Sequence, residues 1–432
     1  MKKVLFLSLI IVLVISLQSF AASNTITYLS PETDPSSVAV DNEIIKAFEK
    51  ANPGVKVFLS HANLEDVLPK LASMLRSGSA PDVAFFSPRY VPALVEQGYL
   101  VPLDDVYKKL GDIPRKFVAP NKTGRVYDIP ASMESMLLYY RKDLFEKAGI
   151  EPPTTFDEWL KAAKELTKDT NGDGKIDQWG MAINGGIPEN YFTFSSILWA
   201  NGGDYFDKNN NVTVDSPQAI EALEFWGKLA QYCPPGVANT RWSDEGIQFS
   251  KGMTAMIRYP GRILLNIDRY NPDMLHSSIG VVPTPVGPSG KKPVVKTTIN
   301  DFVVFKTSKN SSLAKKFIAF YMSDKQYLKF LTTAVPGHSL PVRTSWQNNK
   351  EYYSVPAIQK WDRVVKKSME YAFEYGTDFQ FRNSGAINPY LGLAVSDPTL
   401  STQVNNFMAG QVSAEQALKT VAKAWREIFN VK

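Results

Sequence analysis

The segment GRVYDIPASMESMLLYYRKDLFEKAGIEPPTTFDEW, residues 124–159, decides the fold of this chain. Residues 127–130 are typical of a strand end, and the apolar run 136–140 is typical of a buried strand, with Glu134 between them. Thr155 and Glu158 have the spacing of a capping box, in which a hydroxyl and a carboxylate bond each other's free backbone amides. The segment therefore predicts a strand that crosses between two lobes, followed by a helix that begins after Thr155.

On both sides of this segment, strand-like and helix-like stretches alternate. Strands are expected at 26–29, 55–59 and 82–86, and the apolar series that starts at Leu64 and ends at Leu75 predicts a helix between the last two. Further helices are expected to begin at Ser216 and, through a second capping box, at Ser413. This alternation predicts an α/β fold with a mostly parallel sheet covered on both faces.

The N-terminus carries the pattern of a secretory signal peptide. Lys2 and Lys3 precede an apolar run over residues 4–17, and small residues follow, so we expect cleavage after Ala21. The run is shorter than the ~20 apolar residues of a membrane-spanning helix. Removing residues 1–21 from the 432-residue chain leaves 411 residues, which is too long for one hydrophobic core of at most ~250–300 residues. Two domains are therefore expected.

Composition excludes several classes of protein. The formal net charge is +5, to which Lys2 and Lys3 contribute, and basic residues are dispersed among acidic ones, so no nucleic-acid footprint is present. Cys233 is the only cysteine, which excludes an intramolecular disulfide and a cysteine zinc site, and we expect it to be buried. We expect a monomer.

Several segments, in this order and spacing, resemble the extracellular solute-binding proteins of sugar ABC transporters. These are PDVAFFSPRYVPALVEQGYLVPL at 81–103, the G-x-x-Y-x-I-P and Y-x-K-D-L-F-x-x-A-G-I parts of 124–150, FSKGMTAM at 249–256, KTSKNSSLAKKFIAFYMSD at 306–324 and GQVSAEQAL at 410–418. The resemblance covers nearly the whole mature chain. It implies a two-lobed periplasmic binding protein fold of type II, with residues 22–132 plus 298–333 in the first lobe and 133–297 plus 334–432 in the second.

The resemblance also implies a function. A carbohydrate would be captured by closure of the lobes and passed to the permease subunits of an ABC transporter. No cysteine stands directly after the apolar run of the signal segment, where lipoproteins of this family carry their lipid. Its absence implies a free periplasmic protein and not a lipoprotein. The second and third crossings between the lobes are expected at residues 296–302 and near 334–340.

Ligands of open α/β sheets bind where loops leave the carboxyl ends of strands, so the loops that face the cleft supply the candidate residues. The candidates in the first lobe and on the crossings are Glu32, Asp34, Phe86, Arg89, Tyr90, Glu134, Asn300 and Asp301. Those in the second lobe are Glu189, Tyr191, Trp199, Trp242, Tyr259, Arg262, His338 and Arg382. Aromatic faces suit the C–H surface of a sugar, and charged groups form strong hydrogen bonds with its hydroxyls. Trp226, Trp361 and Trp425, by contrast, are expected to pack in the core or on the surface.

The family pattern is matched at some of these positions and not at others. Phe86, Glu134, Glu189 and Tyr191 match the maltose-binding members. Arg89 departs from the pattern, and Arg262 stands where those members have a stacking tryptophan.

The stretch DTNGDGKID, residues 169–177, fits the first nine positions of an EF-hand calcium loop. The expected metal residues are Asp169, Asn171, Asp173, Lys175, through its carbonyl, and Asp177. Position 12 is Gly180, so the bidentate glutamate is missing and the affinity for Ca²⁺ should fall to the extracellular range of ~10⁻⁴–10⁻³ M. The alternative is a turn rich in Asp, Asn and Gly without a metal.

Three functions remain open from the sequence. The leading hypothesis is the carbohydrate receptor. A carbohydrate-active enzyme would use Glu134 and Glu189 as its acid and nucleophile, but no serine-hydrolase elbow, H-E-x-x-H motif or phosphate loop is present. A receptor for an anionic solute, such as a sugar acid or glycerol phosphate, is suggested by Arg89 and Arg262 at the two edges of the cleft.

Overall fold

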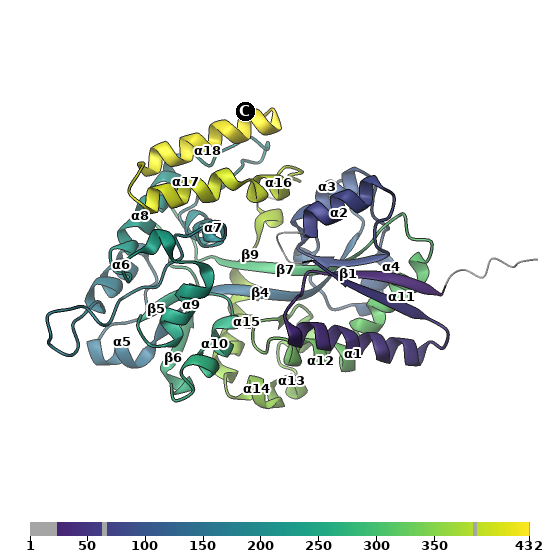
Figure 1. The fold of residues 1–432 in the computed structure, drawn as a ribbon, viewed down its shortest axis with the longest axis horizontal. Coiled ribbons are helices and arrows are strands. Elements are labelled where there is room, and N and C mark those ends of the chain that lie inside the picture. The colour runs from purple at the N-terminus through teal and green to yellow at the C-terminus, as the bar shows by residue number, and fades with distance from the viewer. Residues whose placement is uncertain (1–23, 63–66, 383–386, 432) are drawn as a thin grey trace, which may run out of the picture.

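Two lobes lie side by side and are joined by long strands in the computed structural model (Figure 1). The structure describes residues 24–62, 67–382 and 387–431. The predicted signal peptide, and Leu64 of the predicted helix, lie outside the described residues. None of the described helices is long and apolar enough to cross a membrane.

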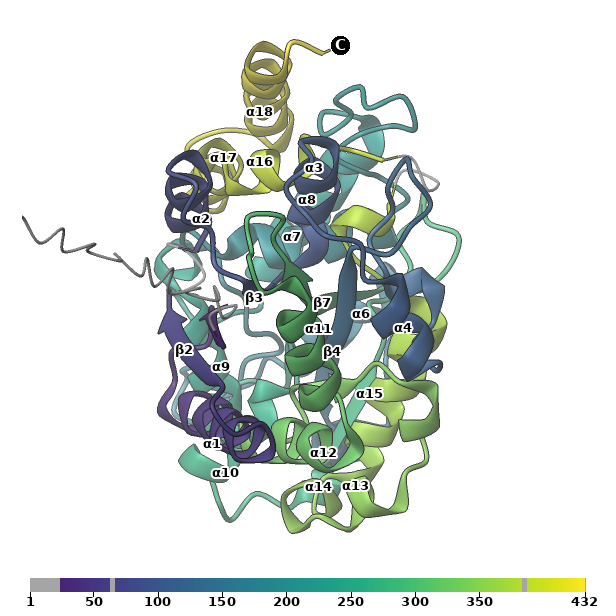
Figure 2. The same cartoon turned by 90° about the vertical axis from the view of Figure 1, so that its right-hand side faces the viewer.

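The first lobe contains the parallel strands β1 (Thr25–Ser30), β2 (Lys56–His61) and β3 (Val83–Phe86), in the order β2-β1-β3. Its helices are α1 (Pro35–Ala51), α2 (Val67–Arg76), α3 (Val91–Glu96), α4 (Asp104–Leu110), α11 (Ser311–Tyr321) and α12 (Asp324–Thr333), with 3₁₀ turns η1 (Pro88–Tyr90) and η2 (Arg115–Phe117). Helix α11 packs across the inner strand β7 (Figure 2). The three strands predicted from the sequence are therefore confirmed.

Two antiparallel strands connect the lobes. Strand β4 (Asp128–Arg141) pairs with β7 (Val295–Val304) from Asp128 opposite Val303 to Met136 opposite Lys296, with an irregularity between Pro130 and Ser132. The two short strand segments expected from the sequence are thus one strand of 14 residues. Its second half, which is the buried run 136–140, continues into the second lobe and pairs there with β5 and β6. The second crossing is confirmed.

Two short strands complete the junction. Strand β8 (Leu340–Pro341) pairs with β4 at Ser132 and Met133, which places a third segment at the crossing as predicted. Strand β9 (Gly376–Thr377) pairs with β7 at its start. Between them, α13 (Lys350–Ser354), α14 (Pro356–Gln359) and α15 (Asp362–Tyr375), with η5 (Thr344–Trp346), lie below the crossing strands, and α15 packs on β4 and β7.

The second lobe surrounds β5 (Met256–Tyr259) and β6 (Ile279–Val282). Its helices are α5 (Lys142–Ala148), α6 (Phe156–Glu165), α7 (Asn190–Ala200), α8 (Pro217–Ala230), α9 (Trp242–Ser250), α10 (Arg262–Tyr270), α16 (Leu391–Ser396), α17 (Pro398–Met408) and α18 (Ala414–Phe429), with 3₁₀ turns η3 (Val237–Asn239), η4 (His276–Ser278) and η6 (Phe379–Phe381). The predicted helix starts are confirmed, because Thr155 and Ser413 form capping boxes and Ser216 accepts a hydrogen bond from the amide of Ala219.

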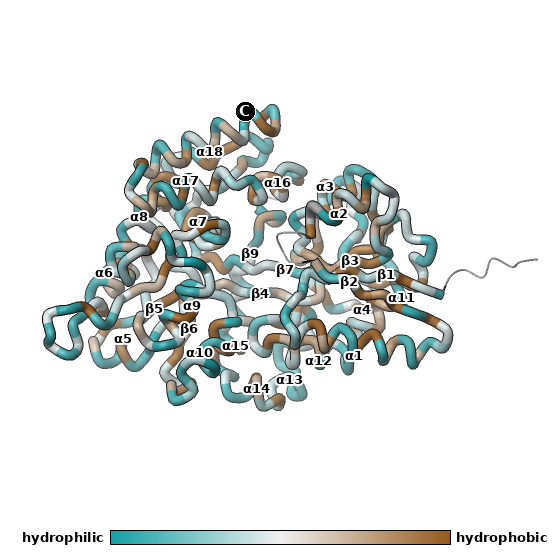
Figure 3. Tube along the Cα trace, in the orientation of Figure 1, coloured by the Kyte–Doolittle hydropathy of each residue, from teal (hydrophilic) through white to brown (hydrophobic). Residues whose placement is uncertain are grey.

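One apolar core cluster runs from the first lobe along the crossing strands to β5, α10 and β6, and a second cluster lies within the second lobe. Brown segments mark apolar residues inside both halves of the molecule (Figure 3). Trp226 and Trp425 lie in the core of the second lobe, and Trp361 lies in the other core cluster, as expected. Cys233 is buried.

Candidate ligand cleft between the lobes

Glu134 lies in the middle of β4, where the strand passes between the lobes. Its Oε1 accepts a hydrogen bond of 2.8 Å from Nδ2 of Asn300 on β7, and its Oε2 lies 3.5 Å from Nε2 of His338. Burial raises the pKa of Glu134, while Arg262 and Asn300 oppose this shift. Burial also lowers the pKa of His338, so its imidazole is neutral at pH 7. A carboxylate, an amide and a neutral imidazole thus converge at the crossing.

Arg262, the first residue of α10, brings a positive charge to this cluster. Its charge opposes the rise in the pKa of Glu32 and Glu134 that burial causes, and adds to the hydrogen bonds from Ser36 and Ser37 that lower the pKa of Asp34. Burial and the neighbouring Glu134 nevertheless raise the pKa of Glu32 to about 7. Asp34 caps α1 and accepts hydrogen bonds from the amides of Ser36 and Ser37.

A row of aromatic rings lines the second lobe. Tyr191 and Phe192, in the first turn of α7, stack with ring centroids 4.3 Å apart. Phe192 lies 6.3 Å from Trp242, and Trp242 stacks on Tyr259 at 4.4 Å, with the hydroxyl of Tyr259 donating to the carbonyl of Trp242. Tyr191, Phe192 and Trp242 are partly exposed, so they can offer faces to a ligand.

Two cations are buried beside this row. The guanidinium of Arg89 on η1 lies 5.9 Å from the ring centroids of both Phe192 and Phe379. The Nζ of Lys296 on β7 lies 4.7 Å from Phe192, donates to Oγ1 of Thr298 at 2.7 Å and pairs with Oδ1 of Asp378 at 3.5 Å. Burial lowers the pKa of Lys296 to about 8.

Lys296, Asp378 and Phe379 were missed by the sequence analysis as cleft residues. Lys296 shares a strand face with Thr298 and Asn300 at a spacing of two, and this alternation was a usable signal once the second crossing had been predicted. Asp378 follows the two-residue strand β9, which has no sequence signature that separates it from a loop.

The first lobe also touches the second directly. Tyr90 approaches α16, and its hydroxyl lies 3.4 Å from Oγ of Ser396. The ring of Tyr90 packs on Gly392, where a Cβ atom would lie 2.4 Å from Cδ1 of Tyr90. Arg89 and Tyr90 of the first lobe thus reach side chains of the second lobe.

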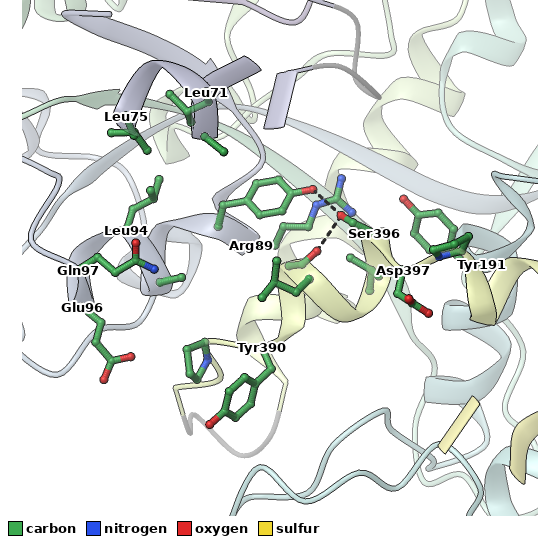
Figure 4. A pocket seen from close by; sticks show the side chains of 18 of the residues that line it. Leu71, Leu75, Arg89, Leu94, Glu96, Gln97, Tyr191, Tyr390, Ser396 and Asp397 are labelled. Carbon is green, nitrogen blue, oxygen red and sulfur yellow. Dashed lines mark hydrogen bonds between the residues drawn. The ribbon is translucent and has the colours of Figure 1, made fainter. Parts of the chain in front are cut away.

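An interlobe groove of about 1080 Å³ opens beside these contacts. Arg89, Tyr90, Glu189, Tyr191 and Phe192 line it together with side chains of α2, α3, α16 and α17. In Figure 4, Leu71, Leu75 and Leu94 lie on one side, Tyr191 and Asp397 on the other, and Arg89 with Ser396 between them. The groove is large enough for a ligand of several hundred daltons.

Several buried side-chain polar atoms in the described part of the cleft have no hydrogen-bond partner. The atoms without a hydrogen bond include Nε of Arg89, both carboxylate oxygens of Asp378, both side-chain polar atoms of Gln380, Nδ1 of His338 and Oε2 of Glu189. Buried polar atoms in proteins are nearly always paired, so each of these atoms has bonding capacity to spare. Among these residues, the side chain of Glu189 is 28% exposed and is the one most open to a polar ligand.

Several predicted ligand residues are buried or are held by contacts within one lobe. Phe86 is buried against Tyr90. Asp301 is fully buried in the sheet beside Asp128, so a ligand cannot reach it in this arrangement. Trp199 is buried in the second lobe, and Arg382 lies over its ring and pairs with Asp204 at 2.8 Å. Trp199 and Arg382 thus pack within the lobe.

The loop at 169–177 forms an exposed series of turns. Asp169 accepts hydrogen bonds from the amides of Gly172 and Gly174, Asn171 from that of Asp173, and Asp173 from that of Lys175. A side chain at position 12 is excluded, since a Cβ on Gly180 would lie 1.9 Å from the carbonyl oxygen of Ala163. Among the described residues, no group of three or more His, Cys, Asp or Glu side chains is arranged to hold a metal ion.

Residues 34–327 match the family described as bacterial extracellular solute-binding protein. The match spans both lobes and more than half of the chain. The chain belongs to this family. Its members are solute-binding proteins of ABC transporters and not enzymes, so the hypothesis that Glu134 and Glu189 are a catalytic pair is rejected.

Curated relatives support the assignment. The chain is 26% identical over 366 residues to the arabinooligosaccharide-binding protein of Halalkalibacterium halodurans, with 80% of this chain and 76% of that protein covered. It is 28% identical over 316 residues to the maltooligosaccharide ABC transporter solute-binding lipoprotein of Streptococcus pneumoniae, with 71% and 70% covered.

Solved structures share the fold. The GacH receptor of Streptomyces glaucescens, determined unliganded and with acarbose, superposes with a TM-score of 0.76 at 22% identity, with 94% of this chain and 99% of that chain covered. Maltose-bound MalE3 of T. maritima superposes with a TM-score of 0.74 at 22% identity and the same coverage. At this level of identity the likeness shows the fold, and the predicted two-lobed periplasmic binding protein architecture is confirmed.

Proposed function

We propose that this solute-binding protein captures a carbohydrate, most simply an oligosaccharide, between its lobes and delivers it to the permease subunits of an ABC transporter. One observation carries the proposal. The partly exposed rings of Tyr191, Phe192 and Trp242 form a row beside a cluster of hydrogen-bonding groups centred on Glu134. Aromatic faces next to charged and amide groups match the two surfaces of a sugar.

The relatives support the same ligand class. Those described as binding arabinooligosaccharides and maltooligosaccharides are similar along both lobes of this chain. The size of the groove, about 1080 Å³, suits a ligand of more than one sugar ring.

A binding panel tests the proposal. The protein is titrated calorimetrically with arabino-, malto-, xylo- and cello-oligosaccharides of two to five units, and each mixture is analysed for products. We expect at least one saccharide to bind unchanged and to stabilise the fold by about 2.7 kcal/mol at a hundred times its Kd. Turnover of the saccharide, or binding of no carbohydrate in the panel, contradicts the proposal.

The cellular location follows from the N-terminal pattern. We propose that residues 1–21 are a cleaved signal peptide and that the mature protein acts in the periplasm as a free monomer, without a lipid anchor and without a nucleic-acid partner. Intact-mass measurement of protein exported by its host checks this, because the mature chain should begin at Ala22 and carry no lipid.

We also propose that the loop at 169–177 binds Ca²⁺ weakly once its turns rearrange around the ion. The support is the spacing of oxygen donors at Asp169, Asn171, Asp173 and Asp177. The ion would have a structural role in the second lobe.

A further inference from the structure

The interlobe groove has an aliphatic wall that carbohydrate binding does not require. Leu71 and Leu75 of α2 and Leu94 of α3 line it from the first lobe, and Leu393 and Val395 of α16 line it from the second. The leucines of the first lobe stand together on one side of the pocket (Figure 4). Leu393 is 62% exposed, so most of its side chain is accessible beside the groove.

This wall has the wrong chemistry for a sugar ring. Sugar hydroxyls need hydrogen-bond partners, and placing them against aliphatic side chains costs free energy because their bonds to water are lost. Leucine also lacks the flat face that an aromatic ring offers to C–H groups. An apolar group, by contrast, gains free energy when it leaves water for such a wall.

The aliphatic wall shares its groove with polar and aromatic residues of the cleft. Arg89, Tyr191 and Phe192 line the same groove as the leucines, so one ligand can contact both regions. Residues of both lobes line the groove. An apolar substituent bound there would therefore be enclosed when the lobes close.

We propose that the natural ligand is a carbohydrate joined to an apolar group, with the sugar in the polar cleft and an alkyl or aryl aglycone between Leu75, Leu94 and Leu393. This inference rests on the proposed function and narrows its ligand class. The aglycone adds buried apolar contact without competing for the hydrogen-bonding groups around Glu134.

The test uses the tightest-binding saccharide of the panel together with its octyl and 4-nitrophenyl glycosides. We expect at least one glycoside to bind tenfold or more tightly than the free saccharide, which corresponds to about 1.4 kcal/mol. Leu393→Asp places a charge in the aliphatic wall and should abolish this ratio. Leu275→Asp is the matched control, because Leu275 is 71% exposed outside the groove and the ratio should persist.

The outcomes separate the inference from the function on which it rests. Equal affinities for the free saccharide and both glycosides overturn the inference and leave the carbohydrate receptor intact. Equal binding of octyl glycosides whatever their sugar shows an unspecific apolar surface and also overturns it. If neither saccharides nor glycosides bind, both the carbohydrate receptor and the apolar aglycone are contradicted.

Discussion

Tyr90 of the first lobe rests on Gly392 of the second, where a Cβ atom would stand 2.4 Å from the Tyr90 ring. The hydroxyl of Tyr90 also reaches Ser396, one turn further along α16. A side chain at 392 is therefore incompatible with this placement of Tyr90. This contact makes closure depend on a glycine that lies in a helix, where glycine is otherwise unfavourable by about 1 kcal/mol relative to alanine.

Gly392→Ala should favour the open form. Alanine suits the helix, so thermal stability should be kept, but Tyr90 must move and closure becomes costlier. We expect carbohydrate affinity to fall by about tenfold, or about 1.4 kcal/mol, and small-angle scattering to show a larger radius of gyration. Ser396→Ala removes only the hydroxyl contact and should have a smaller effect. Unchanged affinity and radius in Gly392→Ala would show that the Tyr90 contact does not control closure.

Lys296→Met should destabilise the protein by about 3 kcal/mol, because it leaves the carboxylate of Asp378 buried without its partner. Both side chains are 1% exposed, so solvent cannot compensate. The double variant Lys296→Met/Asp378→Leu removes both charges and should recover most of the loss. Urea denaturation of the two single variants and the double variant measures the coupling. Additive effects would mean that the pair does not interact.

Asp41 should make stability depend on pH. Burial raises its pKa to about 7, although a hydrogen bond from Tyr321 opposes the shift. The folded state therefore keeps the proton of this carboxyl group up to about pH 7, whereas the unfolded state releases it near pH 4. The contribution of Asp41 to the free energy of unfolding is therefore full below about pH 4 and is lost as the pH rises toward 7. Glu32, with its pKa also raised to about 7, acts in the same direction.

Asp41→Asn keeps an acceptor for Tyr321 without the titrating proton, so its stability should decline less between pH 5 and pH 8 than that of the wild type. Melting temperature measured across this range checks the slope. If the melting temperature of Asp41→Asn falls with pH as steeply as that of the wild type, other groups cause the pH dependence.

Glu134→Gln should weaken carbohydrate binding by about 1.5–3 kcal/mol, the range of a hydrogen bond to a charged group. The amide can still accept from Asn300, so the fold should be unaffected. Glu374→Gln, an exposed change on α15, is the control with the same chemistry. Equal calorimetric affinities for both variants would exclude Glu134 from the ligand site.

Calcium addition should raise the melting temperature of the wild type and not that of Asp173→Ala. The ligand specificity should stay the same in both, because the loop is exposed and none of its residues lines the interlobe groove. If chelator leaves the wild-type melting temperature unchanged, the loop is a turn without a metal.

The sequence determined the features that depend on local periodicity and short-range hydrogen bonds. The capping boxes at Thr155 and Ser413, the strands of the first lobe and the buried run 136–140 follow from residues a few positions apart, and the structure has all of them. Glu134 and Asn300 could be placed at the crossings because the crossings themselves have a recognisable pattern.

The tertiary structure alone decided which of the polar and aromatic candidates meet. Asp301 and Trp199 have residue types suited to ligand binding, yet the sheet and the core of the second lobe bury them. Lys296 and Asp378 lie 82 positions apart and meet through the pairing of β7 with β9. The contact of Tyr90 with Gly392 joins the two lobes through residues 302 positions apart. Such contacts depend on the packing of distant segments, and no local pattern in the chain encodes the distance between them.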